Sequence, residues 1–245
     1  MRTVATIEAR MKSTRLPGKV MRPILGFPML RQMIERLRGC DVLDDIVIAT
    51  TEDPSCDVIE ALALSMGVGC YRGSEEDVLG RVLRTAENAK ADVIVKLTGD
   101  CPLLDPAIVK QVVNAFRSSG VDYCTNTMVE PYPRGMDVEV FPLSVLRETD
   151  PLASSPPERE HASLYIYRHP QRFSLLNVEY DGPKGANGLR LTVDTAEDFA
   201  LVSAVFEALQ SRDPFFSLAD IWAFLSEHPE IRDLNAHVKQ KVVPP

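Results

Sequence analysis

Short apolar runs alternate with helical patterns along the first half of the chain. Buried strands are predicted at residues 3–7, 45–49, 68–71 and 92–96. Helices are predicted around them at residues 29–37, 55–66, 75–89 and 106–119. This order of strands and helices is typical of an α/β fold, in which helices cover both faces of a mostly parallel, doubly wound sheet.

Residues typical of helix ends mark several of these helices. Ser55 and Ser74 are the predicted N-caps of the second and third helices, and Gly67 is predicted to end the second. Asp105 is predicted to cap the fourth helix, with Pro106 in its first position.

The pattern changes after residue 120. Further strands are predicted at residues 121–126, 138–141, 173–179 and 189–193, and further helices at 158–168, 195–209 and 218–227. A turn-rich stretch from Pro131 to Gly135 precedes the second of these strands. We therefore predict one domain spanning residues 1–245, with an inserted lid or dimerisation segment at about 120–190.

Composition excludes several classes of protein. The 245 residues include 35 acidic and 27 basic side chains, and this net charge of −8 gives no general electrostatic basis for binding nucleic acid. The five cysteines form no CxxC pair, which argues against a disulfide framework and a zinc site. There is no signal-peptide pattern, and no apolar run approaches the ~20 residues of a membrane helix. We expect a cytoplasmic protein with neither nucleic-acid nor membrane partners.

A basic loop directly after the first strand carries the clearest chemical signal. In an open α/β sheet, ligands bind beyond the carboxyl ends of the strands. The loop holds four cations and two hydroxyl groups, from Arg10, Lys12, Arg15, Lys19, Ser13 and Thr14. Such donors suit the oxygens of a triphosphate, which only accept hydrogen bonds. We interpret the loop as a phosphate site, with a solvated basic loop as the alternative. It matches neither the Walker A nor the Rossmann glycine pattern.

Two aspartates follow later apolar runs. Asp100 comes beside Gly99 just after one strand, and Asp194 stands where another strand is predicted to give way to a helix. A pair of carboxylates at strand ends can hold Mg²⁺ against phosphate oxygens. Each also has a structural interpretation: Asp100 could cap a turn before Pro102, and Asp194 could cap the following helix. If the two form a bare metal site, Asp194→Asn should leave the melting temperature almost unchanged.

Several motifs together resemble a known family over roughly residues 3–210. They are Ala9-Arg10-Met11, Ser13-Thr14-Arg15-Leu16-Pro17-Gly18-Lys19, Arg72-Gly73-Ser74-Glu75-Glu76-Asp77-Val78-Leu79, Thr98-Gly99-Asp100-Cys101-Pro102-Leu103, Tyr132-Pro133-Arg134-Gly135-Met136-Asp137-Val138-Glu139-Val140, Glu158-Arg159-Glu160-His161 and Val193-Asp194-Thr195. The chain is similar to the cytidylyltransferases that activate acidic sugars, the group containing CMP-KDO synthetase and acylneuraminate cytidylyltransferase. It is closest to the branch of spore-coat polysaccharide biosynthesis protein F. Two residues depart from that branch, because Glu8 stands where it usually has glutamine and Lys12 where it usually has glycine.

The resemblance implies a Mg²⁺-dependent enzyme with the fold of nucleotide-diphospho-sugar transferases that binds CTP. The residues that it assigns to the nucleotide are Ala9, Arg10, Ser13, Thr14, Arg72, Gly73 and Thr98. It assigns catalysis to Arg15 and Lys19, which would reach the phosphates. It assigns Mg²⁺ to Asp100 and Asp194.

A second group of residues is a candidate for binding the acceptor. It comprises Arg134, Asp137, Glu139, Glu160 and His161. Arg134 could bind an acidic group of the acceptor. His161 could bind a sugar hydroxyl or act as a base, and a helix cap or core contact is the alternative. The alternation of Asp137 and Glu139 predicts one shared strand face, and it also resembles the acidic metal motif of glycosyltransferases.

The predicted activity is transfer of CMP from CTP to an acidic sugar or a similar small acceptor. Pyrophosphate would be released, and the product would serve as a precursor of a polysaccharide or glycoconjugate. The alternatives are a glycosyltransferase of related fold and a non-catalytic nucleotide-binding protein. Three aromatic residues of the inserted segment, Tyr132, Tyr165 and Tyr167, look exposed in the sequence. Together with the resemblance they predict a homodimer.

Overall fold

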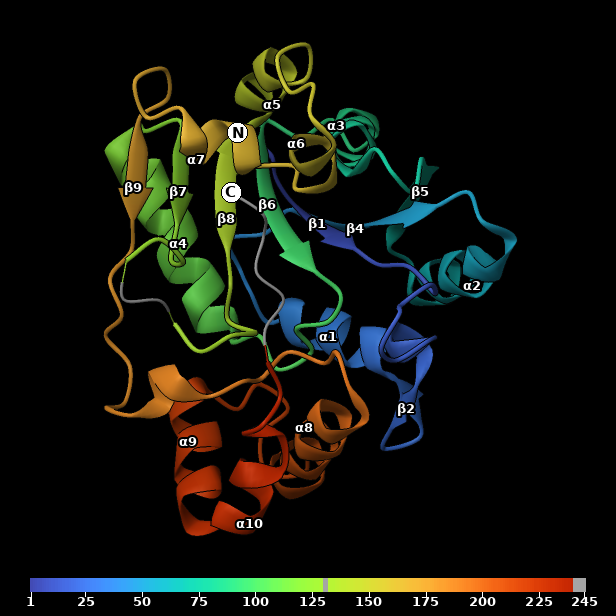
Figure 1. The fold of residues 1–245 in the computed structure, drawn as a ribbon, viewed down its shortest axis with the longest axis vertical. Coiled ribbons are helices and arrows are strands. Elements are labelled where there is room, and N and C mark those ends of the chain that lie inside the picture. Colours follow the sequence, from blue (N-terminus) through green and yellow to red (C-terminus); the bar gives the residue numbers. More distant parts are fainter. Residues whose placement is uncertain (130–131, 240–245) are drawn as a thin grey trace.

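A seven-stranded sheet forms the centre of the molecule (Figure 1). The computed structural model describes residues 1–129 and 132–239. In spatial order the strands are β5 (Gly69–Gly73), β4 (Asp45–Thr51), β1 (Thr3–Glu8), β6 (Val93–Thr98), β8 (Glu139–Pro142), β7 (Tyr123–Thr125) and β9 (Leu175–Asn177). Among these described strands only β8 runs antiparallel to its neighbours.

Helices cover both faces of this sheet. One face packs against α1 (Met29–Leu37), α2 (Asp57–Met66) and α4 (Pro106–Ser119), while α8 (Ala196–Leu209), α9 (Leu218–Glu227) and α10 (Pro229–Arg232) lie together below the sheet in Figure 1, and α8 and α9 extend the same core. The other face packs against α3 (Val78–Asn88), α5 (Leu143–Thr149) and α7 (Leu164–Arg168), with α6 (Pro156–Glu160) against α3. The short elements are the hairpin of β2 (Pro23–Ile24) and β3 (Phe27–Pro28), and the 3₁₀ turns Lys19–Met21, Pro54–Cys56, Ala186–Gly188 and Asp233–Asn235. No helix in the described part is long and apolar enough to cross a membrane.

The predicted α/β fold with a mostly parallel sheet is confirmed. Helices α1, α4 and α9 have the predicted bounds, and Asp105 caps α4 by accepting the Ala107 N–H at 2.8 Å. The N-cap predicted at Ser55 is wrong, because Asp53 caps the 3₁₀ turn that precedes α2. The third helix begins at Val78 rather than at residue 75, since its cap is Asp77, not Ser74.

The second half of the chain departs further from the sequence prediction. The segment predicted as an insertion supplies β7, β8 and β9 to the main sheet. Residues 189–193 form no strand, and one isolated bridge joins Arg134 to Arg190. The helix predicted at 158–168 is divided into α6 and α7 by the non-helical backbone of His161. Pro131 of the turn-rich stretch lies outside the described residues.

A buried arginine ties the loop after β6 to the C-terminal helices. Arg36 is 1% exposed, and its guanidinium donates to the Leu103, Leu104 and Phe216 carbonyls at 3.4, 3.3 and 2.7 Å. Burial lowers the pKa of Arg36 to about 10, although Asp105 acts in the opposite direction. The guanidinium therefore fixes the loop that carries Asp100 against two other parts of the fold.

Candidate active site

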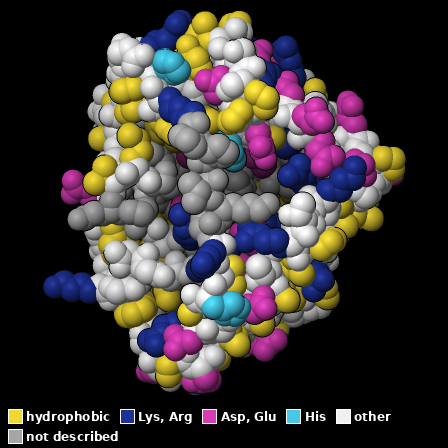
Figure 2. Space-filling model, in the orientation of Figure 1, with side chains coloured by type: hydrophobic (Ala, Val, Ile, Leu, Met, Phe, Trp, Pro, Cys, Tyr) yellow, Lys and Arg dark blue, Asp and Glu magenta, His cyan; other side chains and the backbone are white. Residues whose placement is uncertain are grey.

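The loops after β1 and β6 meet at the carboxyl ends of these strands. Glu8 and Thr98 are register partners, and the Gly99 N–H donates to the Glu8 carbonyl at 2.8 Å. The Val193 N–H donates to the Asp100 carbonyl, also at 2.8 Å. The structure therefore brings the basic loop and both predicted aspartates to one place. Figure 2 shows Lys and Arg side chains gathered around the middle of this face, where the sheet meets the C-terminal helices.

Lys19 lies between the two aspartates. Its Nζ is 3.0 Å from Asp100 Oδ2 and 2.9 Å from Asp194 Oδ1, and it donates to the Val193 carbonyl at 2.7 Å. Burial acts to lower the pKa of Lys19, but the two carboxylates raise it above its ordinary value. The group between the aspartates is therefore a charged ammonium.

Asp194 is bound by three cations. Besides Lys19, Arg15 Nη2 lies 2.9 Å and Arg190 Nη2 2.7 Å from its Oδ2. Burial acts to raise the pKa of Asp194, but Lys19 and then Arg15 hold it below its ordinary value. The carboxylate is thus ionised and fully surrounded by positive charge.

The interpretation of Asp194 as a helix cap is wrong. Thr195 and Asp198 form the capping box of α8, with the Asp198 Oδ2 accepting the Thr195 N–H at 3.0 Å. Asp198 also binds Arg190 Nε at 2.9 Å and Asn235 Nδ2 at 2.8 Å. Asp194 therefore does not cap α8. Asp198, which does, also binds Arg190 and holds it against Asp194.

The two aspartates suit a hard divalent cation. Their oxygens approach one Nζ within 3.0 Å, so they converge on a single cation position. Mg²⁺ typically takes one or two carboxylates and completes its shell with phosphates and water. No group of three or more His, Cys, Asp or Glu residues is arranged for a metal in the described part of the chain. The two carboxylates therefore fit a metal ion whose other ligands come from a phosphate substrate and water.

The rest of the basic loop is held by ion pairs at its surface. Arg10 Nη1 lies 3.1 Å from Glu75 Oε1. Lys12 Nζ lies 2.6 Å from Asp53 Oδ2 and 3.4 Å from Glu75 Oε2. The residue that departs from the family branch, Lys12, is thus used to tie the loop to its neighbours. Of the hydroxyls, Ser13 Oγ accepts the Leu16 N–H at 3.4 Å, while Thr14 is exposed.

The side chain of Arg72 is bound by α2, by the last residue of β4 and by the loop after it. Its guanidinium turns to α2, where Nη1 lies 2.7 Å from Asp57 and 2.9 Å from Glu60. It also donates to the Thr51 and Asp53 carbonyls at 3.1 and 3.0 Å. The side chain therefore joins β5 to α2, and the contacts of Arg72 and Gly73 with a nucleotide stay predictions.

Glu139 is the hub of a buried cluster beside the site. Its carboxylate lies 2.7 Å from Lys96 Nζ and accepts the Tyr123 hydroxyl at 2.7 Å and the Ser163 hydroxyl. Glu8 Oε1 lies 3.6 Å from the same Lys96 Nζ. Burial acts to lower the pKa of Lys96, but Glu139 and Glu8 raise it above its ordinary value. Glu139 is thus engaged internally, and its predicted contact with the acceptor gains no support.

Asp137 lies just before β8 rather than on one strand face with Glu139. Burial, and then the charges of Glu139 and Asp100, raise the pKa of Asp137 to about 6, although Arg134 and Lys96 act in the opposite direction. Within the described residues no side chain forms a hydrogen bond or an ion pair with this carboxylate. A half-buried carboxylate with a raised pKa is a candidate for a functional residue.

The comparisons with known proteins agree with this geometry. A family model described as cytidylyltransferase matches residues 4–234. The chain belongs to the cytidylyltransferase family. The spore coat polysaccharide biosynthesis protein SpsF of Bacillus subtilis is 34% identical over 229 residues, covering 91% of this chain and 94% of that protein. The 3-deoxy-manno-octulosonate cytidylyltransferase of Geobacter metallireducens is 30% identical over 113 residues, covering 46% and 44%.

A solved structure supports the fold of this cytidylyltransferase along its whole length. The cytidylyltransferase of Leptospira borgpetersenii has a TM-score of 0.88 and 34% sequence identity, covering 99% of both chains. The resemblance inferred from the phosphate loop and the two aspartates is therefore confirmed at the level of the family. The roles of individual residues stay predictions.

The remaining acceptor candidates lie apart from the aspartates in the sequence and on separate elements. Arg134 is exposed, and its carbonyl accepts the Leu191 N–H at 2.8 Å. Glu160 is exposed at the end of α6, and the half-buried His161 follows it. Their contacts with an acceptor stay predictions.

Of the tyrosines expected to be exposed in this cytidylyltransferase, Tyr132 is buried and Tyr165 and Tyr167 are half-buried. Tyr132 is 2% exposed, and its hydroxyl donates to Gln111 Oε1 and Asp181 Oδ1, both at 2.9 Å. Tyr165 stacks on His169 at 3.9 Å, and Tyr167 packs against Tyr123 at 6.2 Å. They therefore give no support to the predicted homodimer.

Sequence reasoning missed Arg190 and Lys96. Arg190 stands four residues before Asp194, which is ion-pair spacing in a helix, but the segment is not helical. Lys96 was visible only as a charged residue within an apolar run. A lysine inside a buried strand is a signal for a buried carboxylate partner.

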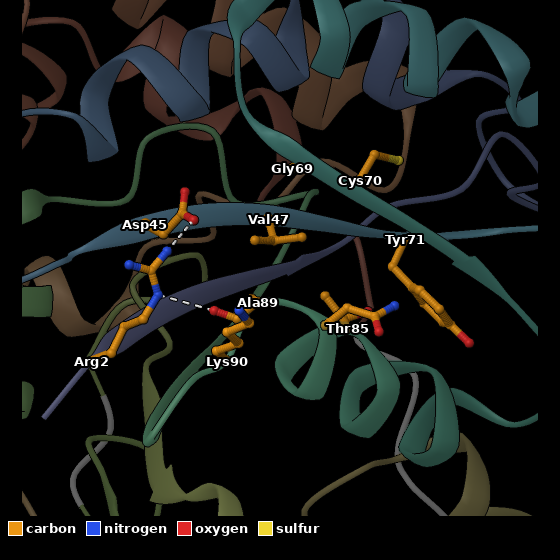
Figure 3. Close-up of a pocket in the computed structure, with 10 residues that line it drawn as sticks. Arg2, Asp45, Val47, Gly69, Cys70, Tyr71, Thr85, Ala89 and Lys90 are labelled. Atoms are coloured by element: carbon orange, nitrogen blue, oxygen red, sulfur yellow. Dashed lines mark hydrogen bonds and ion pairs between the residues drawn. The ribbon is translucent and has the colours of Figure 1, made fainter.

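A hollow of about 510 Å³ lies at the other ends of the strands (Figure 3). The amino ends of β4 and β5 and the end of α3 line it. Arg2 spans it by binding Asp45 Oδ2 at 2.7 Å and the Ala89 carbonyl at 3.0 Å. Because ligands of open α/β sheets bind at the carboxyl ends of the strands, this hollow is separate from the nucleotide site.

A glycine sets the position of the segment that carries Asp137. Gly135 has φ 100°, and an added Cβ would lie 2.7 Å from the Leu191 carbonyl carbon. We expect Gly135→Ala to destabilise the fold by roughly 2–3 kcal/mol, because strain and backbone overlap add. Urea unfolding measures this. Gly120→Ala is the matched control, with φ 68° and no atom within 4 Å. Equal losses in both variants would show that the contact with Leu191 is unimportant.

Proposed function

We propose that this chain transfers CMP from CTP to a hydroxyl group of a small acidic sugar and releases pyrophosphate. The observation that carries the proposal is the placement of Lys19 between Asp100 and Asp194, with Arg15 beside them. These groups lie at the carboxyl ends of β1 and β6, where a nucleotide binds in an open α/β sheet. Membership of the cytidylyltransferase family supports cytosine as the base.

The residues act by positioning and by balancing charge. Arg15 and Lys19 would leave Asp194 for the triphosphate and offset the charge that develops on the leaving pyrophosphate. The loop backbone around Ala9 and the strand end at Gly73 would face the base and ribose. No covalent intermediate with the protein is needed, since the acceptor hydroxyl can attack the α-phosphorus directly.

Asp100 and Asp194 would hold Mg²⁺. When bound, the ion would neutralise phosphate charge and align the triphosphate. The carboxylates would become available for the ion if the ammonium of Lys19 moved to the substrate. Arg190, which is held by Asp198, would keep Asp194 in place during this exchange.

The acceptor class rests on the relatives. One is named for a spore coat polysaccharide and another for 3-deoxy-manno-octulosonate, an acidic sugar. The glycosyltransferase alternative would use Asp137 and Glu139 as a metal motif. The engagement of Glu139 by Lys96, Tyr123 and Ser163 speaks against it. The intact set of Lys19, Arg15 and two aspartates speaks against a non-catalytic binding protein.

Activity is tested by pyrophosphate release. The protein is incubated with Mg²⁺, each of the four ribonucleoside triphosphates, and a panel of acidic sugars that includes 3-deoxy-manno-octulosonate. Release that needs both CTP and an acidic sugar supports the proposal. Release of a nucleoside diphosphate or CMP from a nucleotide sugar donor, with no pyrophosphate from CTP, would favour the glycosyltransferase alternative.

Nucleotide choice is expected to show as thermal stabilisation. CTP with Mg²⁺, at 100 times its dissociation constant, should stabilise the fold by about 2.7 kcal/mol. For a chain of this length that corresponds to a rise in melting temperature of roughly 5–10 °C. UTP, ATP and GTP at the same concentration serve as controls. A rise with GTP or ATP and none with CTP would contradict the cytidylyl assignment.

We further propose a cytoplasmic homodimer as the working form. All five cysteines are free thiols in the structure, as expected for a reducing compartment. Exposed apolar side chains of the β2–β3 hairpin, Leu25 and Phe27, offer a surface that the buried tyrosines do not.

A further inference from the structure

The segment before β8 is held rigidly against the reaction centre. The side chain of Asn126 pins it on both sides, since Asn126 donates to the Met136 carbonyl at 2.8 Å and accepts the Val138 N–H at 2.9 Å. Met136 Sδ accepts the Asp105 N–H at 3.4 Å. These contacts therefore hold the backbone on both sides of Asp137 in place.

This segment also lies beside the chain that carries Asp194. The Leu191 N–H donates to the Arg134 carbonyl, and the Val193 N–H donates to the Asp100 carbonyl, both at 2.8 Å. Residues 191–193 thus run between the segment of Asp137 and the loop of Asp100. Asp100 and Asp194 share Lys19, and Asp100 is near enough to Asp137 for its charge to raise the pKa of Asp137.

The third of these carboxylates differs from the other two. Asp100 and Asp194 are bound by Lys19 within 3.0 Å. Asp137 has no hydrogen bond or ion pair with any described residue, and the ammonium of Lys96 is engaged by Glu139 at 2.7 Å. A half-buried, fixed carboxylate that no described side chain binds is open to a donor from water or from a ligand.

We propose that Asp137 is a catalytic residue that binds the attacking hydroxyl of the acceptor and takes its proton. In this step the acceptor oxygen forms a bond to the α-phosphorus of CTP. The bond from the α-phosphorus to the bridging oxygen breaks, and its electron pair leaves with pyrophosphate. The hydroxyl proton passes to an oxygen of Asp137. The inference rests on the proposed function and assigns the acceptor side of the same site.

The surroundings of Asp137 suit this role. A general base works best when its pKa lies near the working pH and it is deprotonated there, and burial raises the pKa of Asp137 to about 6. The charged groups that face it are Asp100, Glu139, Arg134 and Lys96. The other candidate base, His161, lies at the junction of α6 and α7.

The test uses Asp137→Asn, which preserves size and removes the proton acceptor. Pyrophosphate release is measured between pH 5 and pH 9 with CTP and Mg²⁺, once with water as the only nucleophile and once with 3-deoxy-manno-octulosonate. In the wild type, kcat should fall about tenfold per pH unit below about pH 6. Asp137→Asn should lower kcat by about 10²–10⁴-fold and lose this pH dependence.

Two further measurements separate the possible outcomes. The thermal shift with CTP and Mg²⁺ should be unchanged in Asp137→Asn, and its loss would overturn the proposal by placing Asp137 among the nucleotide or metal ligands. Carboxyl NMR of the metal-free protein, labelled with ¹³C-aspartate, should show a resonance that is missing in Asp137→Asn and titrates near pH 6. A midpoint near ~3.9 would overturn the proposal.

Controls complete the design. Asp220→Asn is a matched change in the capping box of α9, remote from the site, and should behave as the wild type. If His161→Gln removes the pH dependence and Asp137→Asn does not, the proposal is wrong. If the wild type releases no pyrophosphate with either nucleophile, the proposed function fails, and the NMR titration still decides whether Asp137 has the character of a base.

Discussion

Asp194→Asn is expected to lower turnover by about 10²–10³-fold and to destabilise the fold by about 1–3 kcal/mol. The activity falls because the proposed cation and the triphosphate lose a ligand. The stability falls because Lys19, Arg15 and Arg190 lose their shared counter-charge. Steady-state pyrophosphate release and urea unfolding measure the two effects.

The pH dependence of the same variant has a definite sign. The pKa of Asp194 is lower in the folded protein than its ordinary value, so its stabilisation is complete above about pH 4 and is lost as the pH falls through the lower, folded-state value. Asp194→Asn should therefore lose stability relative to the wild type at pH 7 and approach it in acid. Normal turnover in Asp194→Asn would refute the two-aspartate site.

Lys19→Met is expected to reduce turnover by about 10²–10³-fold, since the change keeps the length of the side chain and removes its charge. It also leaves Asp100 and Asp194 facing each other without the ammonium that now joins them. Mg²⁺ alone should then raise the melting temperature of the variant more than that of the wild type, because the ion no longer competes with Lys19.

The matched control for Lys19→Met is Lys110→Met. Lys110 pairs with Asp41 at 2.8 Å on the surface, and half of its side chain is exposed. Its replacement should change neither turnover nor the response to Mg²⁺, since exposed pairs contribute little. An equal Mg²⁺ response in Lys19→Met and the wild type would contradict the proposed position of the metal.

The sequence predicted the parts of the site that follow from strand ends. Parallel strands deliver their following loops to one edge of the sheet, so Lys19 and Asp100 could be expected to meet, whereas Asp194 joins them although residues 189–193 before it form no strand. The helices with clear caps, such as α4 after Asp105, were also predictable. These features depend on local patterns and on one general rule of α/β folds.

The failures concern long side chains and distant partners. The backbone of Arg72 was placed correctly, but nothing in the sequence told that its guanidinium turns to Asp57 and Glu60. Tyr132 follows a turn-rich stretch and looked exposed, yet its hydroxyl finds partners on α4 and near residue 181. Such choices are made by tertiary contacts, which periodicity does not report.

The expected stability effect of Asp194→Asn changed from almost none to a loss for the same reason. From the sequence, two converging carboxylates would repel, so removal of one charge should leave the melting temperature almost unchanged. In the structure, Arg15, Lys19 and Arg190 all bind Asp194. The carboxylate of Asp194 is thus attracted by three cations, and Asp194→Asn removes this attraction.

The link from Asn235 to the aspartate site has a consequence for how the protein matures. Asn235 donates to the Arg190 carbonyl at 2.9 Å and to Asp198, and Arg190 in turn holds Asp194. The residues that must assemble therefore span the chain from Lys19 to Asn235. Because a ribosome delivers the chain from its N-terminus at about 5–20 residues per second, the nucleotide loop is made long before its partners. A nascent chain can form most of the sheet, but the contacts that hold Arg190 against Asp194 are complete only after Asn235 has emerged.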